Sequence, residues 1–438
     1  MTTVRMKEAV LIKPSEKTPH EVLSLSTLDS QLFLRFSIEY LLVFLPSEAT
    51  QCDVVSNMKV ALAKALVAYY PLAGRVRAKT DGLGLEVHCN AQGAVFIEAA
   101  SEHYTVHDFS NAPLHVSQWR PFLTFHVPDV LSGAPPVVLQ LTWLKDGAAV
   151  LGVGLNHPLC DGIGSGHFLN SLAEFARSTL GATKLKPEPK WDRYLLDPQA
   201  NAVHHLCNPM QFTKIDHVPG TRLLMEKLVP TSVTFDRKTI NELKRLSVSK
   251  AEVFTAYEVV SAQVWMSWAA SLNLPEKQVL RLLFSVNIRS KLSPSLPEGY
   301  YGNAFILGCA EATVKDLTGR GLAHVSKLVR EAKESADGGG VCSLLKVLSE
   351  EREICPDLTG ALVVSQWSRL GLEKIEFGMG RAVHVTPVCC VRYCLVLPAG
   401  ADRPPDYLRV MVAVPSTAVH QYLTFINNPY SFVHNHST

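Results

Sequence analysis

The segment from Ala148 to Gly164, AAVLGVGLNHPLCDGIG, decides the fold because a strand-like pattern ends and a helical pattern begins on either side of one histidine. Its first eight residues form an apolar run that is typical of a buried strand. The residues that follow it have the spacing of one apolar helix face, at Phe168, Leu169, Leu172, Phe175 and Ala176. His157 therefore stands where a buried strand ends, shortly before a helix begins.

The pattern His157-x-x-x-Asp161-Gly162 makes His157 a candidate general base. Histidine is the side chain best suited to accept a proton at neutral pH, and α/β folds place their chemistry at strand ends. Gly162 and Gly164 allow backbone or ligand to approach closely. The pattern is short, so a hydrogen-bonded turn histidine is the competing interpretation of His157.

The predicted fold class is α/β (α+β), because strand-like and helix-like segments alternate along the chain. A chain of 438 residues with 47% hydrophobic side chains can bury a large core, and it predicts two domains. Residues 186–220 are rich in Pro, Lys, Asn and His and predict a crossover loop. This places one domain at 1–185 and the other at 221–438.

Individual elements follow from periodicity and from capping residues. The Asp146-Gly147 turn predicts a hairpin between strands at 137–143 and 148–155. Further elements are expected as helices at 54–70, 166–178, 253–271 and 317–336, and as strands at 228–235, 279–289 and 407–415. Asp236 is expected to cap one helix and Ser416 the last one. Two α/β halves of similar size predict a ligand site in the cleft between them.

Composition excludes several functional classes. The net charge is +2 and the cationic side chains are scattered, which gives no support for nucleic-acid binding. The sequence shows no secretory signal, and charges interrupt every long apolar stretch. The ten cysteines are dispersed without zinc-site spacing, so they predict reduced thiols in a cytoplasmic protein that holds no metal.

Six motifs in order along the chain carry a resemblance to the plant BAHD acyltransferases. They are Leu25-Ser-Thr-Leu-Asp29, Tyr69-Tyr-Pro-Leu-Ala-Gly-Arg75, His157-Pro-Leu-Cys-Asp161-Gly162, Val286-Asn-Ile-Arg289, Gly299-Tyr-Tyr-Gly-Asn303 and Glu376-Phe-Gly-Met-Gly380. The resemblance spans nearly the whole chain. It implies two chloramphenicol-acetyltransferase-like domains with the active site in the channel between them.

The resemblance also implies roles for residues and ligands. His157 would be the general base, while Asp161 would point away from it and pair with Arg289; Asp161, Gly162 and Arg289 would then be structural. Acyl-CoA would be a co-substrate, with no permanently bound cofactor, and the acceptor would be a small alcohol or amine. The chain would act as a monomer, without nucleic-acid or membrane partners.

The last motif departs from the family pattern Asp-Phe-Gly-Trp-Gly. Glu376 and Met379 replace the aspartate and the tryptophan, and Ala382 stands where a proline usually follows. Glu376 is a candidate catalytic residue only by motif position, and we expect a structural role on the second-domain and CoA side. The replacements should alter packing or CoA affinity more than chemistry.

Two further candidates are less specific. Ser365-Gln366-Trp367 resembles a segment from which relatives supply a hydroxyl and an indole N–H toward the oxyanion, so Trp367 is a possible oxyanion donor. A core tryptophan is the alternative. Ser249 and Lys250 precede a predicted helix and could bind the CoA phosphates, although an ordinary solvated loop fits equally.

Three functional classes remain open from the sequence. The first is a CoA-dependent acyltransferase that moves an aromatic acyl group, benzoyl or hydroxycinnamoyl, onto a hydroxyl, with an amine or polyamine acceptor as the close alternative. The second is a catalytically weakened homologue that acts as a binding or regulatory protein. The third is a carnitine- or chloramphenicol-type transferase or a condensation domain, against which the stretches Tyr69–Arg75 and Tyr300–Asn303 argue.

Overall fold

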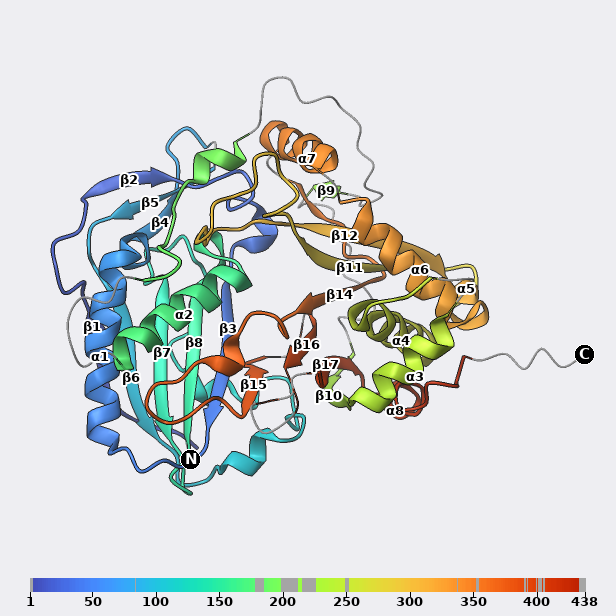
Figure 1. The fold of residues 1–438 in the computed structure, drawn as a ribbon, viewed down its shortest axis with the longest axis horizontal. Helices are drawn as coiled ribbons and strands as arrows, with labels where there is room; N and C mark the ends of the chain where they lie inside the picture. The colour runs from blue at the N-terminus through green and yellow to red at the C-terminus, as the bar shows by residue number, and fades with distance from the viewer. Residues whose placement is uncertain are drawn as a thin grey trace, which may run out of the picture.

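The computed structural model describes most of the chain in two sheet-centred halves (Figure 1). The described residues are 3–82, 84–177, 185–197, 212–214, 226–248, 252–336, 338–351, 354–389, 391, 393–398, 400, 404 and 406–432. Of the expected crossover loop, they include 186–197 and 212–214. Among the described helices, none is both long enough and apolar enough to cross a membrane.

A six-stranded sheet forms the centre of the first half. In spatial order its strands are β1 (Arg5–Ile12), β6 (Ala94–Ala100), β7 (Val137–Trp143), β8 (Ala149–Asn156), β3 (Ser37–Phe44) and β15 (His384–Pro387). Only β6 and β7 pair in parallel. Strands β7 and β8 are the predicted hairpin, antiparallel and fully buried, so the apolar run before His157 is a central strand.

The second half is built on a second six-stranded sheet. Its strands, in spatial order, are β10 (Leu228–Phe235), β17 (Leu408–Pro415), β16 (Cys394–Pro398), β14 (Ala361–Gln366), β11 (Val279–Asn287) and β12 (Phe305–Thr313). Smaller sheets pair β2 (Glu21–Ser24), β5 (Leu85–Cys89) and β4 (Arg75–Ala78), and β13 (Ile354–Pro356) with β9 (Phe212–Lys214).

Helices cover both sheets. In the first half, α1 (Gln51–Ala68) and α2 (Gly162–Arg177) lie side by side over one face (Figure 1). The second half carries α3 (Arg237–Ser247), α4 (Ala256–Ser271), α5 (Val314–Gly319), α6 (Gly321–Glu334), α7 (Gly338–Glu350) and α8 (Val419–Ile426). Helix α4 is buried on nearly all sides, which explains why it lacks an amphipathic pattern.

Two local predictions are wrong. The helix expected at 317–336 is divided into α5 and α6, because Gly321 adopts a positive φ of 78° that breaks the helical path. Ser416 does not cap the last helix, which begins at Val419 after Ala418. The cap at Asp236 is confirmed, since its side chain accepts a hydrogen bond from the Thr239 N–H.

One element of the second half belongs to the first sheet. Strand β15 pairs antiparallel with β3, with His384 opposite Val43. Leu372, Ile375, Phe377 and Met379 pack into the apolar core between the first sheet and its helices. The expectation that the Glu376–Gly380 segment shapes the second domain is therefore wrong: this segment packs on the first.

Candidate active site

His157 lies directly after β8, at the first position of a 3-10 turn that ends at Leu159. Its backbone N–H donates to Phe36 O at 2.9 Å, and its carbonyl oxygen accepts from Asn303 Nδ2 at 2.7 Å. Phe36 belongs to the first half and Asn303 to the second. The backbone of His157 is thus fixed from both halves of the molecule.

Aromatic side chains surround the His157 imidazole. Phe36 packs edge to face on it with ring centroids 5.1 Å apart, and Phe305 lies at 6.0 Å. Burial lowers the pKa of His157 below its ordinary value, and the nearby carboxylates Asp161 and Asp29 only partly oppose this. A lowered pKa keeps the imidazole neutral at pH 7, which is the form that accepts a proton.

Asp161 and Arg289 form a two-pronged ion pair across the two halves. Arg289 Nη1 lies 2.8 Å from Asp161 Oδ2, and Nη2 lies 3.0 Å from Oδ1. The backbone N–H groups of Gly164 and Ala304 also donate to this carboxylate. Burial alone would raise the pKa of Asp161, but Arg289 and these donors lower it, so the carboxylate stays ionised.

Gly162 and Gly164, at the start of α2, lie close to residues of the second half. A Cβ at Gly164 would lie 1.9 Å from the Tyr301 carbonyl oxygen, and one at Gly162 would lie 2.9 Å from Leu370 Cδ1. Both distances are shorter than carbon-containing groups tolerate. Gly162 therefore admits a side chain of the segment after β14, and Gly164 admits the backbone that precedes Asn303.

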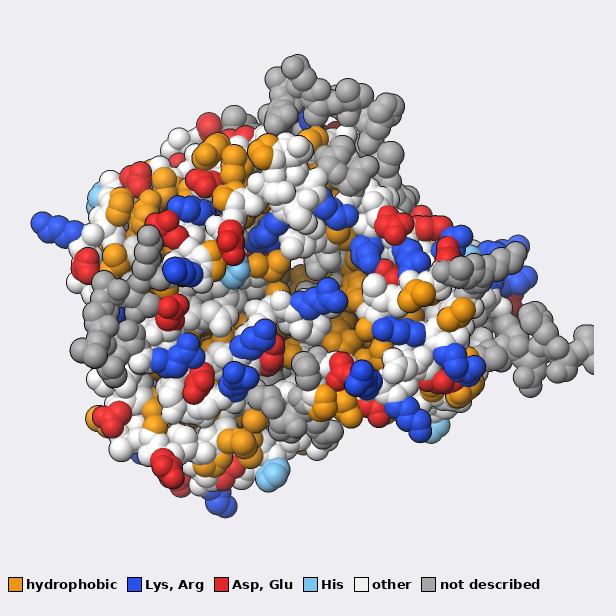
Figure 2. Space-filling view, viewed as in Figure 1, with side chains coloured by type: hydrophobic (Ala, Val, Ile, Leu, Met, Phe, Trp, Pro, Cys, Tyr) orange, Lys and Arg blue, Asp and Glu red, His pale blue; other side chains and the backbone are white. Residues whose placement is uncertain are grey.

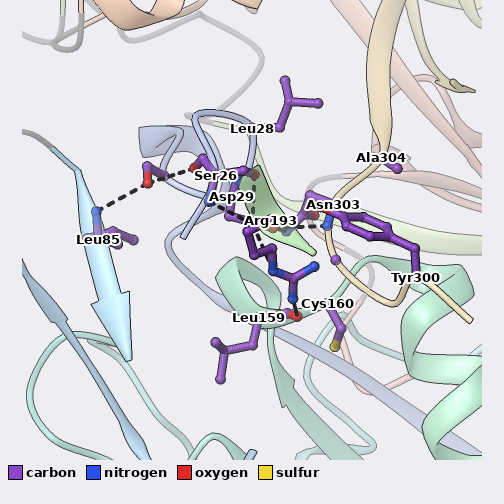
Figure 3. A network of polar contacts seen from close by, with 12 residues as sticks. Ser26, Leu28, Asp29, Leu85, Leu159, Cys160, Arg193, Tyr300, Asn303 and Ala304 are labelled. Atoms are coloured by element: carbon purple, nitrogen blue, oxygen red, sulfur yellow. Dashed lines mark hydrogen bonds and ion pairs between the residues drawn. The ribbon is translucent and has the colours of Figure 1, made fainter. Parts of the chain in front are cut away.

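A buried polar network beneath the His157 turn was not predicted from the sequence (Figure 3). Asp29 is fully buried and accepts from Asn303 through both its backbone N–H, at 2.9 Å, and its side chain, at 2.8 Å. Arg193, from the crossover segment, lies against the same carboxylate, with Nε 3.2 Å from Asp29 Oδ2. Asp29 and Asn303 stood in recognised motifs; nothing local in the sequence marked Arg193.

Trp367 follows β14 and faces the first half. Its indole N–H donates to Ser365 Oγ at 3.1 Å, and its ring packs edge to face on Tyr40 at 5.4 Å. The Tyr40 hydroxyl in turn shares a 2.5 Å hydrogen bond with Ser165 of α2. Trp367 is therefore a partly exposed interdomain residue and not a core tryptophan of the second half.

Glu376 lies at the opposite end of α2 from His157. The carboxylate is 3.8 Å from Arg177, the last residue of that helix, and both side chains are substantially exposed. Since α2 has 16 residues, its two ends are about 24 Å apart at 1.5 Å per residue. This position supports a structural role for Glu376. Ser249 and Lys250 fall outside the described residues.

The two halves leave a recess between them. Figure 2 shows this face hollowed near its centre, with hydrophobic side chains visible at depth. Two other surface depressions are lined by α3 residues such as Arg237 and by residues of β1 and β6, and His157 lines neither. His157 itself belongs to the first half, but its backbone contacts, Phe36 and Asn303, come one from each half, so the candidate site lies where the two halves meet.

The family model described as Transferase family matches residues 2–416. Taxadien-5-alpha-ol O-acetyltransferase of Taxus chinensis is 31% identical over 96% of this chain and 95% of its own length. Benzyl alcohol O-benzoyltransferase of Petunia hybrida is 30% identical over 88% and 83%.

The chain belongs to the BAHD acyltransferase family. This BAHD protein is accordingly an enzyme of the acyltransferase class, whose relatives transfer acyl groups to oxygen. Among solved structures, vinorine synthase shares the fold with a TM-score of 0.75, 20% identity and coverage of 95% of this chain and 96% of its own. F. graminearum TRI101, complexed with coenzyme A and T-2 mycotoxin, has a TM-score of 0.74 at 17% identity, with coverage of 92% and 96%.

Proposed function

We propose that this BAHD enzyme transfers an aromatic acyl group from acyl-CoA to a small-molecule hydroxyl, with His157 as the general base. The observation that carries the proposal is the placement of His157. Its backbone is fixed from both halves, and its ring lies among aromatic side chains with a pKa lowered by burial. A neutral, positioned imidazole is what deprotonation of an alcohol at neutral pH requires.

The reaction then has three parts. His157 takes the proton of the acceptor hydroxyl as the hydroxyl oxygen attacks the thioester carbonyl carbon, and a tetrahedral intermediate forms. The carbon–sulfur bond breaks, and the proton passes to the departing CoA thiol. Ser365 and Trp367 are proposed to stabilise the oxyanion. The Ser365 hydroxyl accepts a hydrogen bond from the Trp367 indole N–H at 3.1 Å, so its own O–H is available to donate to the oxyanion.

An aromatic group fits the surroundings of the base. Phe36 and Phe305 are both partly exposed beside the imidazole, and Tyr393 stacks on Phe36 with centroids 6.2 Å apart. Aromatic faces and edges bind a planar group with geometric preference beyond area burial. Relatives named for benzoyl and feruloyl transfer make benzoyl or hydroxycinnamoyl the leading donors.

Nitrogen is the second candidate acceptor atom. 3'-N-debenzoyl-2'-deoxytaxol N-benzoyltransferase of Taxus canadensis is 32% identical over 87% of this chain and 85% of its own length. An amine that is neutral in the site can be deprotonated by the same imidazole as it attacks. The intact His157 and Asp161–Arg289 arrangement argues against a catalytically weakened binding protein.

We further propose a monomer in the cytoplasm that takes acyl-CoA as a co-substrate and needs no permanently bound cofactor. The eight described cysteines are all free thiols, as expected in a reducing compartment.

The test is acyl transfer by the purified chain. Benzoyl-CoA, a hydroxycinnamoyl-CoA and acetyl-CoA would each be offered with benzyl alcohol, with the matched amine benzylamine and without acceptor, while free thiol is followed in time. We expect acceptor-dependent thiol release, with kcat/KM for an aromatic donor at least about tenfold above acetyl-CoA. Thiol release that prefers acetyl-CoA would refute the donor assignment, and absence of release with every pair would refute the activity.

A further inference from the structure

Arg193 connects the crossover segment to the turn that carries His157. The side chain is 2% exposed, and its Nη2 donates to the Leu159 carbonyl oxygen at 2.7 Å. Its Nε lies 3.2 Å from Asp29 Oδ2, close enough for an ion pair although not aligned for a hydrogen bond. Figure 3 shows the guanidinium between Asp29 and Leu159.

Aromatic rings enclose the same guanidinium. Its central carbon lies 4.3 Å from the ring centroid of Trp191, 5.1 Å from Tyr300 and 5.0 Å from Tyr301. Burial lowers the pKa of Arg193, yet Asp29, Tyr300 and Tyr301 together raise it above its ordinary value. Arg193 is therefore a permanent buried cation in a fixed position.

Two polar routes lead from Arg193 to the His157 turn. One is direct, through the Leu159 carbonyl at the end of the turn. The other passes through Asp29 and Asn303 to the carbonyl of His157 at its beginning. Arg193 is consequently linked to both ends of the three-residue turn, directly at Leu159 and through Asp29 and Asn303 at His157.

Gly302 provides the space that the guanidinium fills. A Cβ at position 302 would lie 1.3 Å from Arg193 Nη1 and 2.2 Å from its Cζ. The Gly302 carbonyl also accepts from Arg289 Nη2 at 2.9 Å. The glycine thus contacts both the buried Arg193 and the half-buried Arg289, and any larger residue would displace Arg193.

We propose that Arg193, admitted by Gly302, is a positioning residue that holds the His157 turn in its reactive geometry. The expected loss of rate rests on the proposed function, because it requires His157 to be the general base. The expected change in the His157 titration does not. Displacement of a reacting group by about 1 Å can cost on the order of 10²-fold in rate. The predicted crossover loop then contributes a residue that positions the base.

Three variants test the contact. Arg193→Met removes the guanidinium, Arg193→Lys keeps the charge but loses the bond to Leu159, and Gly302→Ala displaces an intact arginine. We expect kcat to fall by about 10- to 100-fold in Arg193→Met and Gly302→Ala, and by less in Arg193→Lys. The KM for acyl-CoA should change by less than about threefold, because the proposed role of the turn is to position the base that acts on the acceptor's proton.

A double-mutant cycle between positions 193 and 302 distinguishes loss of this contact from nonspecific destabilisation of the fold. Methionine lacks the two guanidinium atoms nearest to a Cβ at 302, which leaves the Tyr300 hydroxyl, 2.9 Å away, as the one remaining close contact that is given for this Cβ. Gly302→Ala should therefore cost much less in kcat once Arg193→Met is present. The matched controls are Gly319→Ala, where a Cβ meets nothing within 4 Å, and Arg237→Met, whose side chain is 78% exposed. Both controls should keep wild-type kcat and thermal stability.

The imidazole titration gives a readout that does not need turnover. In protein labelled at histidine carbon, the His157 signal is identified by its absence in His157→Ala. Loosening the turn should hydrate the ring and move its pKa upward toward the ordinary 6.5 in Arg193→Met and Gly302→Ala, but not in the controls. This shift would persist even if His157→Ala proved active and the base role were lost.

The outcomes are decisive in either direction. A folded Arg193→Met or Gly302→Ala protein with wild-type kcat and wild-type His157 titration would overturn the proposal. Strict additivity of Arg193→Met and Gly302→Ala would do the same. If Arg193→Met does not fold, the other two variants decide alone, and failure of all three to fold would show that the network serves folding instead of positioning.

Discussion

Two motifs lie at opposite ends of α2: His157–Gly162 at its N-terminal end and Glu376–Gly380 at its C-terminal end. The contacts at the two ends differ in kind. At the N-terminal end, hydrogen bonds of Asn303 and Arg193 hold the His157 turn, and the Asp161–Arg289 ion pair joins the two halves beside it. At the C-terminal end, Phe377 and Met379 are buried among apolar neighbours, and Glu376 makes one loose ion pair with Arg177 at 3.8 Å.

The difference shows which motif can vary. Buried polar networks specify position, because each group requires a particular partner in a particular direction. Apolar packing requires mainly volume and shape, so Met379 can stand where relatives carry tryptophan if neighbours adjust. The altered motif is consequently weak evidence for lost activity, whereas a change beneath His157 would be strong evidence.

The largest expected effect comes from removing the base. His157→Ala should lower turnover by about 10²- to 10⁴-fold while acyl-CoA affinity stays near wild type, because the imidazole acts on the acceptor's proton. Steady-state kinetics and calorimetric titration with CoA would measure the two quantities, with the exposed His126→Ala as the control. Retention of more than about a tenth of the wild-type rate would remove His157 from this role.

The next largest effect concerns the interdomain ion pair. Asp161→Ala and Arg289→Ala should each destabilise the fold by about 3–5 kcal/mol, because the first leaves a half-buried arginine and the second a buried carboxylate without its partner. The double variant should cost less than the sum of the two. Asp161→Ala should be the more severe single change, since it also orphans the N–H groups of Gly164 and Ala304.

Urea unfolding of the four proteins measures that cycle. The control is the exposed pair Lys327–Glu331, 3.9 Å apart within one helix, which should contribute no more than about 0.5 kcal/mol. Strictly additive losses at Asp161 and Arg289 would mean that the two residues do not stabilise each other, and the contrast between the ends of α2 would lose its main support.

The dependence of activity on acidic pH should come from His157, at the N-terminal end of α2, and not from Glu376 at its C-terminal end. Because burial lowers the pKa of His157 and only the neutral imidazole accepts a proton, the acidic limb of kcat/KM should be centred below pH 6.5. Below the lowered pKa, kcat/KM should fall about tenfold per pH unit. An acidic limb centred above pH 7 would contradict the assignment, and Glu376→Ala should leave the limb in place.

Local patterns predicted the site's scaffold, but not the contacts beneath it. The β7–β8 hairpin and the position of His157 at a strand end follow from residues adjacent in sequence, and the Asp161–Arg289 pair followed from the family resemblance. Arg193 meets Leu159 across 34 residues, and Asn303 meets Asp29 across 274. Such pairings depend on how the two halves pack, which hydrophobic periodicity does not encode.

The same limit explains the misplacement of the late motif. Strand β15 joins the first sheet through pairing with β3, more than 300 residues earlier. A four-residue strand with no hairpin partner nearby carries no signal for the sheet it will join. The segment at Glu376–Gly380 was therefore assigned to the wrong half, although its structural character was expected.

Restoring the family tryptophan should have a moderate effect. Met379 is 3% exposed in a filled core, so Met379→Trp should overpack it and cost about 1–3 kcal/mol in the free energy of unfolding. Turnover of the folded fraction should change by less than about tenfold, because Met379 lies three residues after Glu376, which contacts the end of α2 opposite His157. Met379→Leu, which conserves volume, is the matched control and should cost less than about 1.5 kcal/mol.

The smallest effect is expected at Glu376, and it is the sharpest test of the comparison. Its ion pair with Arg177 is long and exposed, so Glu376→Ala should change the free energy of unfolding by no more than about 1 kcal/mol. Turnover and CoA affinity should remain near wild type, because about 24 Å of helix separates the two ends of α2. A well-folded Glu376→Ala protein with normal CoA binding and turnover reduced about 10³-fold would place this carboxylate in proton transfer. The chemistry would then not be confined to the His157 end, and the distinction between a polar, positioning end and an apolar, tolerant end would fail.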